Sequence, residues 1–326
     1  MKPGNLSDGA NSCGIIPRDK EDTEKDSSFS RSVLFYVLNS VLSLYIIGGV
    51  SMKKLSLLFA IISLSLTLLL AGCGGATADK KSDTKSEAVT VTVGASPVPH
   101  AEILEFIKPI LAKEGVNLKI VEFTDYVKPN LALADKELDA NFFQHKPYLD
   151  KFSSERNLKL EEAAKIHLEP MGVYSHKIKS LDELKAGDSM AIPNDPTNGG
   201  RALLILQSAE IIKLKDGGTI TSTVMDITDN PKNIKFVELE AAQIPRSLDD
   251  VTAAVINTNF AIEAKLNPLK DALFLESKNS PYANILVVRT GDVTRPEIQK
   301  LIKALNSPEV KKFIEDKYQG AILPSF

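Results

Sequence analysis

The amino-acid sequence predicts an α/β fold built from two units with a ligand cleft between them. Short segments rich in β-branched residues alternate with segments of helical periodicity from residue 89 onward, a pattern typical of parallel strands joined by crossover helices. The alternation runs in two series, and the last strand and helices return the chain to the first unit. Because ligands bind beyond the carboxyl ends of strands in open α/β sheets, the cleft is the expected binding site.

The first unit, lobe 1, is predicted over residues 89–174 and 277–326. Residues 89–93 alternate Val and Thr as a strand does, and residues 101–113 place Ile and Leu at helical spacing. The other strands and helices expected in this lobe lie at 118–123, 126–138, 140–143, 147–156, 285–289, 295–305 and 308–318.

The second unit, lobe 2, is predicted over residues 175–276. Residues 180–183, with the sequence SLDE, begin a short helix with a capping box, and residues 200–212 form a strongly apolar helix. The remaining elements expected in this lobe are three strands and a helix, at 189–192, 234–239, 253–256 and 260–266.

A lipoprotein signal precedes the first strand. Lys53 and Lys54 are followed by an uncharged apolar run that ends in Leu-Ala-Gly before Cys73, which is the order of regions in a signal peptide with its processing site. The run is shorter than the roughly 20 residues that a membrane span needs, although a buried core helix or a short anchor is the alternative. We therefore interpret residues 52–72 as a signal peptide and Cys73 as a lipidation site. Residues 73–88 are then a flexible tether at the extracytoplasmic face of the cell membrane.

The first 51 residues are predicted to be a mis-called extension. They are polar and charged up to residue 32, and an apolar run follows at residues 33–50. Residues 47–51, with the sequence IGGVS, fit the translation of a ribosome-binding site ahead of Met52, which we take as the start. Read literally, the apolar run is instead a second transmembrane candidate.

Composition and motifs exclude several functions. The formal net charge of −3 leaves no electrostatic footprint for nucleic acid. The two cysteines, Cys13 and Cys73, cannot build a disulfide framework or a cysteine metal site. Nucleotide-binding, serine-hydrolase and zinc-peptidase motifs are absent, and the four histidines do not pair at metal-ligand spacing. We therefore expect no catalytic residue, no cofactor and no metal, with a three-histidine zinc site assembled across the fold as the alternative.

One candidate binding segment covers residues 139–148, with the sequence DANFFQHKPY. A strand here places Asn141, Phe143 and His145 on one face, at a strand-to-helix junction. Aromatic surface beside one imidazole suits an apolar ligand side chain with a polar tip. The alternative is that the phenylalanines belong to the core and that His145 caps a helix.

Two further polar segments suit a charged ligand. In residues 194–201, with the sequence NDPTNGGR, glycines at a helix start and the planar fork of Arg201 suit a carboxylate. Asn257 and Asn284, in the segments NTN and SPYAN, offer amide oxygens to an ammonium group. A solvated arginine and ordinary turn residues are the alternatives. Together the three segments describe a site for a free amino acid.

These segments resemble the methionine-binding lipoproteins of the NlpA/MetQ type. The resemblance rests on the signal and tether and on DYVKPNLAL, DANFFQHKPYL, NDPTNGGRAL, AAVINTNFA and SPYAN in this order, and it covers residues 52–326. It implies a type II-like periplasmic-binding-protein fold with two lobes joined by two crossovers. The implied ligand is methionine, handed to an ABC permease with its ATPase in the membrane where Cys73 is anchored. The L isomer, the D isomer and a methionine-containing dipeptide all remain open.

The resemblance also implies roles for single residues. Tyr126, Phe143 and Tyr148 enclose the thioether side chain, with His145 nearby. Arg201 binds the α-carboxylate, and Asn257 and Asn284 hold the amino group and the carboxylate region. Phe142, on the opposite strand face, is left as core. Two other functions stay as alternatives, a receptor for zinc or a dipeptide and an exported lipoprotein hydrolase that uses His145.

Overall fold

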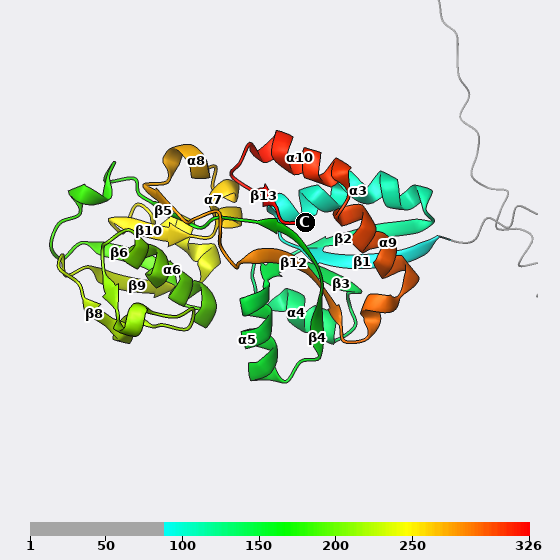
Figure 1. The fold of residues 1–326 in the computed structure, drawn as a ribbon, viewed down its shortest axis with the longest axis horizontal. Coiled ribbons are helices and arrows are strands. Elements are labelled where there is room, and N and C mark those ends of the chain that lie inside the picture. The colour runs from blue at the N-terminus through cyan, green and yellow to red at the C-terminus, as the bar shows by residue number, and fades with distance from the viewer. Residues whose placement is uncertain (1–87) are drawn as a thin grey trace, which may run out of the picture. The chain divides into compact units, whose positions relative to one another are not determined.

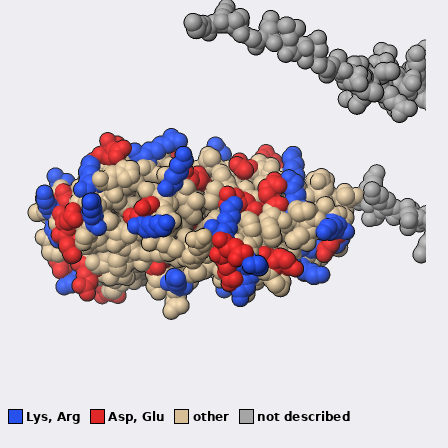
Figure 2. Space-filling view, turned by 90° about the horizontal axis from the view of Figure 1, so that it is seen from above, with Lys and Arg blue, Asp and Glu red and all other residues tan. Residues whose placement is uncertain are grey.

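A computed structural model describes residues 88–326, which form two large β-sheets and one two-stranded sheet, with helices covering the large sheets (Figure 1). The signal peptide, the lipidation of Cys73 and residues 73–87 of the expected tether lie outside the described residues. Within the described part of the chain, no helix has the length and apolar character needed to cross a membrane. Acidic and basic side chains are interspersed over the face shown in Figure 2, so this face has no extended patch of one sign.

The sheet of lobe 1 has six strands in the order β13-β4-β12-β3-β1-β2. β1 pairs in parallel with β2 and β3, whereas β12 pairs antiparallel with β3 and β4. The sheet is therefore mixed, and β4 and β12 lie side by side although lobe 2 separates them in the sequence (Figure 1). The bounds are β1 (Val89–Ala95), β2 (Val116–Glu122), β3 (Ala140–His145), β4 (Leu160–Leu168), β12 (Ala283–Arg289) and β13 (Leu323–Pro324).

Helices of lobe 1 bury their apolar faces against this sheet. In α3, Ile103, Leu104, Ile107 and Leu111 are fully buried and lie on one helix face, as the sequence spacing predicts. Phe142 of β3 belongs to the same core, which confirms its expected place. The elements of this lobe outside the sheet are η1 (Pro97–Ala101), α3 (Glu102–Lys113), α4 (Lys128–Ala134), α5 (Lys146–Arg156), η6 (Asp292–Thr294), α9 (Pro296–Leu305) and α10 (Pro308–Tyr318).

The sheet of lobe 2 has five strands in the order β11-β5-β10-β6-β9. β6 pairs in parallel with β9 and β10, and β5 pairs antiparallel with β10 and β11. Its strands are β5 (Gly172–Tyr174), β6 (Ser189–Pro193), β9 (Lys235–Leu239), β10 (Ala253–Ile256) and β11 (Phe274–Leu275). A hairpin and helical segments complete the lobe: β7 (Lys213–Leu214), β8 (Ile227–Asp229), η2 (Leu181–Glu183), η3 (Lys215–Gly217), η4 (Val224–Asp226), η5 (Ala241–Ser247), α6 (Pro196–Ser208), α7 (Thr258–Glu263) and α8 (Pro268–Asp271).

Three elements differ from the sequence expectation. α6 begins at Pro196 rather than at residue 200, because the side chain of Asp195 accepts a hydrogen bond from the Asn198 backbone N–H and caps the helix. β4 was not expected, because its first half is charged and only partly buried and so lacks an alternating pattern. β5, expected in lobe 1, pairs within the sheet of lobe 2. The chain therefore crosses between the sheets at residues 169–171 and again at 276–282.

Candidate functional site

A narrow pocket, with a cavity volume of about 20 Å³, lies between the two lobes. It forms where β3 ends and where α6 and α7 begin, so strand ends and helix starts from both lobes supply its walls. All seven residues predicted to bind the ligand line it, although their role in binding stays a prediction. The lining residues are Tyr126, Phe143, Gln144, His145, Tyr148, Glu169, Asn198, Arg201, Asn257, Thr258, Asn259 and Asn284.

Lobe 1 contributes an aromatic wall, formed by Tyr126, Phe143 and Tyr148. The ring centroid of Tyr126 lies 5.9 Å from that of Phe143 and 6.0 Å from that of Tyr148. The Tyr148 hydroxyl donates to the Tyr126 carbonyl at 2.9 Å, and the Tyr126 hydroxyl donates to Oδ1 of Asn259 at 2.6 Å. With both hydroxyls paired, this wall presents mainly apolar ring surface to the pocket.

His145 has two structural roles at the junction of β3 and α5. Its Nδ1 accepts from the Tyr148 backbone N–H at 3.2 Å, so it caps α5, and its side chain also lines the pocket. Because Nδ1 is an acceptor, Nε2 carries the proton and donates to Oδ1 of Asn198 at 3.2 Å. Burial, assisted by the charge of Arg201, lowers the pKa of His145 to about 3. The imidazole is therefore neutral at pH 7.

Arg201 lies in the first half of α6 and is 3% exposed, so the alternative of a solvated arginine is wrong. Its Nε and Nη2 donate to the two carboxylate oxygens of Glu276 at 3.0 and 2.5 Å. Nη2 also donates to the Glu169 carbonyl at 2.8 Å, and the ring of Tyr282 lies 4.3 Å from the guanidinium carbon. Within residues 88–326, Nη1 has no hydrogen bond. Glu276 and the Glu169 carbonyl thus occupy Nε and Nη2, and Nη1 is the guanidinium nitrogen without a hydrogen bond among the described residues.

Two asparagines leave polar atoms unpaired in the pocket wall. Asn257 donates through Nδ2 to Asn198 at 2.9 Å, while its buried Oδ1 has no partner among the described residues. Asn259 accepts through Oδ1 from Tyr126, while its buried Nδ2 has no partner there. Buried polar groups are normally hydrogen-bonded. An unpaired acceptor and an unpaired donor in one pocket therefore fit a ligand that carries both kinds of group. We call Asn198, Arg201, Asn257 and Asn259 the polar wall.

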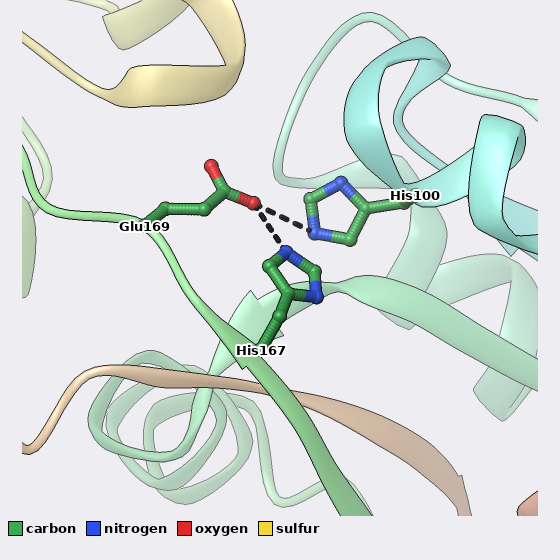
Figure 3. A group of neighbouring side chains, drawn as sticks. All are labelled: His100, His167 and Glu169. Atoms are coloured by element: carbon green, nitrogen blue, oxygen red, sulfur yellow. Dashed lines mark hydrogen bonds and ion pairs between the residues drawn. The ribbon is translucent and has the colours of Figure 1, made fainter. Parts of the chain in front are cut away.

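Asn284, at the start of β12, and a nearby cluster lie beside the end of β4. Its Oδ1 lies 3.1 Å from Nε2 of His100, which in turn lies 3.3 Å from Oε1 of Glu169. Nε2 of His167 approaches the same oxygen at 2.7 Å, so the two imidazoles converge on one carboxylate (Figure 3). Burial lowers the pKa of His100 to about 4 and that of His167 to about 3, and it raises the pKa of Glu169.

The same three side chains could hold a metal ion, because one ligand atom of each lies within 4.8 Å of the others. Sequence reasoning found no such set, since His100 and His167 are far apart in the chain and only the fold brings them together. At 2.7 Å the contact of His167 with Glu169 is a hydrogen bond that a neutral imidazole can donate without an ion, and His100 has its own hydrogen-bond partner in Asn284.

Sequence reasoning also missed Glu169 and Glu276. Both lie at the crossovers between the lobes, and Glu276 meets an arginine 75 residues away. Single acidic residues outside any motif carry no signal of such a contact.

Comparisons with known proteins agree with this architecture. The D-methionine-binding lipoprotein MetQ of Escherichia coli K12 is 46% identical over 256 residues, which cover 78% of this chain and 92% of that protein. The solved structure of a nutrient binding protein from Burkholderia cenocepacia bound to methionine is 49% identical, with a TM-score of 0.70, and the match covers 72% of this chain and all of that one. A periplasmic substrate-binding protein of an ABC transporter from Coxiella burnetii is 45% identical, with a TM-score of 0.69 and coverage of 72% and 100%.

These matches confirm the predicted two-lobed α/β fold. The proteins named are binding proteins and not enzymes, so they give no support to the alternative of an exported hydrolase. A family model described as NlpA lipoprotein matches residues 91–326, which is nearly all of the described part of the chain. The expected resemblance is therefore confirmed, and the chain belongs to the NlpA lipoprotein family.

Proposed function

We propose that this chain is the substrate-binding protein of an ABC importer and that it binds methionine. One observation carries the proposal: the aromatic wall, Arg201 and the unpaired amide groups of the polar wall all line the same pocket. Free amino acids need partners for a carboxylate and an ammonium group, and a thioether packs favourably against aromatic rings. The methionine in the structure of the Burkholderia cenocepacia relative supports the same ligand.

Binding in this proposal makes and breaks no covalent bond. Nη1 of Arg201 and Nδ2 of Asn259 donate to the α-carboxylate, and Oδ1 of Asn257 accepts from the ammonium group. The thioether side chain enters the aromatic wall, where burial of apolar surface contributes roughly 25 cal/mol per Å². Ligand contacts with both lobes favour the closed arrangement over an open one. We place the hinges at the two crossovers, residues 169–171 and 276–282, where the chain passes from one sheet to the other.

We further propose that the protein is held at the extracytoplasmic face of the membrane by lipid on Cys73. Two or more acyl chains are needed for stable anchoring, and a tether at residues 73–88 raises the effective concentration of the receptor at its permease. Replacing Cys73 with Ala should move the protein from the membrane to the soluble fraction. A Cys73→Ala variant that stays in the membrane fraction would argue for another anchor.

Calorimetric titration tests the ligand. The purified protein is unfolded and refolded to remove any bound ligand and is then titrated with L-methionine, D-methionine, Gly-Met and zinc chloride. The expected result is that a methionine isomer binds with a dissociation constant below the millimolar range. Saturation by zinc alone, or by none of the four, would contradict the proposed function. The order of affinities among the isomers and Gly-Met decides which form of methionine the pocket takes.

A further inference from the structure

Glu169 lies at the first crossover, directly after β4, and reaches the pocket wall while only 5% exposed. Its two carboxylate oxygens face different lobes. Oε1 meets His100 and His167 of lobe 1, whereas Oε2 points away from both rings (Figure 3) and accepts from the Asn259 backbone N–H at 3.1 Å. Glu169 is therefore held from both lobes at the edge of the pocket.

The carboxylate of Glu169 has no permanently charged partner in the described part of the chain. The groups within ion-pair distance there are His100 and His167, whose imidazoles carry a charge only when they are protonated. Arg201 donates to the backbone carbonyl of Glu169 and not to its carboxylate, because the guanidinium group pairs with the carboxylate of Glu276. Burial raises the pKa of Glu169, as expected for a carboxylate with too little positive charge around it. Buried charges are normally paired, so a counter-charge is missing here.

The carboxylate also keeps room for one more donor. An ionised carboxylate offers about four lone-pair sites, and hydrogen bonds from His167 and the Asn259 N–H use two of them, while Nε2 of His100 lies 3.3 Å from Oε1. A ligand ammonium group has three N–H donors, enough for both Glu169 and the unpaired Oδ1 of Asn257, which line the same pocket. A methionine carboxylate could not take this place, since two like charges would meet.

We propose that Glu169 accepts the α-ammonium group of the ligand, and that His100 and His167 are positioning residues that hold its carboxylate at the pocket wall. This inference rests on the proposed function and deepens it, because it makes a positively charged α-amino group a requirement of the site. Asn257 then supplies a neutral hydrogen bond to the same group, while Glu169 supplies the charge.

The test compares two ligands that differ only at the amino group, methionine and 4-(methylthio)butanoate. In the refolded wild-type protein, methionine should bind at least about tenfold more tightly, as expected when a buried charge gains its partner. Glu169→Gln keeps the shape and removes the charge. It should weaken methionine binding at least about tenfold and change binding of the des-amino ligand less than about threefold, so the preference largely disappears.

Glu263→Gln is the matched control. Glu263 lies on α7, where burial and the charge of Glu169 raise its pKa to about 7, but it does not line the pocket. It should leave the preference for methionine unchanged. An equal loss of both ligands in Glu169→Gln, or no loss of either, would overturn the inference, as would a wild-type protein without the preference. Wild-type protein that binds neither ligand would instead contradict the proposed function.

The positioning residues are tested through the same preference. His167→Leu removes the hydrogen bond to Oε1, whereas His167→Gln keeps an N–H donor. The preference should fall in the leucine variant and be restored in the glutamine variant, with thermal unfolding measured for both. A preference that is unchanged in folded His167→Leu would contradict the positioning role. If Glu169→Gln does not fold, the two His167 variants still test whether the Glu169 carboxylate produces the preference for methionine.

Discussion

The two walls of the pocket differ in how completely their polar groups are paired. In the aromatic wall, the hydroxyls of Tyr126 and Tyr148 both donate to protein acceptors. In the polar wall, Nη1 of Arg201 has no hydrogen bond, Asn257 has a free acceptor and Asn259 has a free donor within the described residues. The comparison indicates that lobe 1 presents an apolar surface whose polar groups are already paired. Lobe 2 presents polar groups that still lack a partner and could pair with a ligand.

This difference predicts how substitutions should act. A change in the polar wall leaves a ligand charge or a protein charge without its partner, which is costly in a buried site. A change in the aromatic wall removes part of an apolar contact, whose cost grows with the area lost. Effects on affinity should therefore be larger in lobe 2 than in lobe 1.

Arg201→Ala should give the largest effect, a loss of at least about 2 kcal/mol of methionine affinity, because the ligand carboxylate loses a buried cationic partner. Titration calorimetry measures this loss. Arg156→Ala is the matched control, since Arg156 stacks on the ring of Phe152 and does not line the pocket. A near-neutral result for Arg201→Ala would place the carboxylate elsewhere. The variant also leaves Glu276 unpaired, so its unfolding is measured beside its affinity.

The sequence predicted the aromatic wall more completely than the polar wall. Phe143 and His145 share a strand face, and the period of a strand is local, so the segment 139–148 could be read without the fold. Arg201 was also found, because a glycine-rich helix start is a local pattern. Glu169 and Glu276 were not found, since each acts through side chains that lie far away in the chain. β4 was missed for a related reason: its partly exposed first half has no apolar alternation.

Lowering the pH should lower the unfolding free energy of the protein, because His145 beside the aromatic wall is held neutral in the fold. Its pKa of about 3 in the folded protein lies below the value of about 6.5 expected in the unfolded chain, so the unfolded state binds the proton more readily. The stability that the neutral imidazole contributes is complete above pH 6.5 and is lost as the pH falls toward 3. His100 and His167 act in the same direction.

His145→Asn keeps a capping acceptor for α5 but does not titrate in this range. Between pH 6.5 and 5.5, the unfolding free energy of the wild-type protein should fall by about 1 kcal/mol more than that of His145→Asn. Urea unfolding at both pH values measures the difference. His176→Asn, a change at an exposed histidine paired with Asp249, is the control and should follow the wild-type protein. Parallel pH dependence of the wild-type protein and His145→Asn would show that His145 is not neutral in the fold.

The smallest effect on affinity is expected for Phe143→Leu, which shortens the aromatic wall without exposing a charge. Methionine affinity should fall by about 0.5 to 1 kcal/mol, because a smaller apolar side chain covers less of the thioether. Phe142→Leu is the matched control, as Phe142 is a neighbour on the same strand that is buried in the lobe-1 core. It should lower the unfolding free energy and leave affinity within error. Equal losses of affinity in the two variants would mean that strand packing, and not the aromatic surface, controls binding in lobe 1.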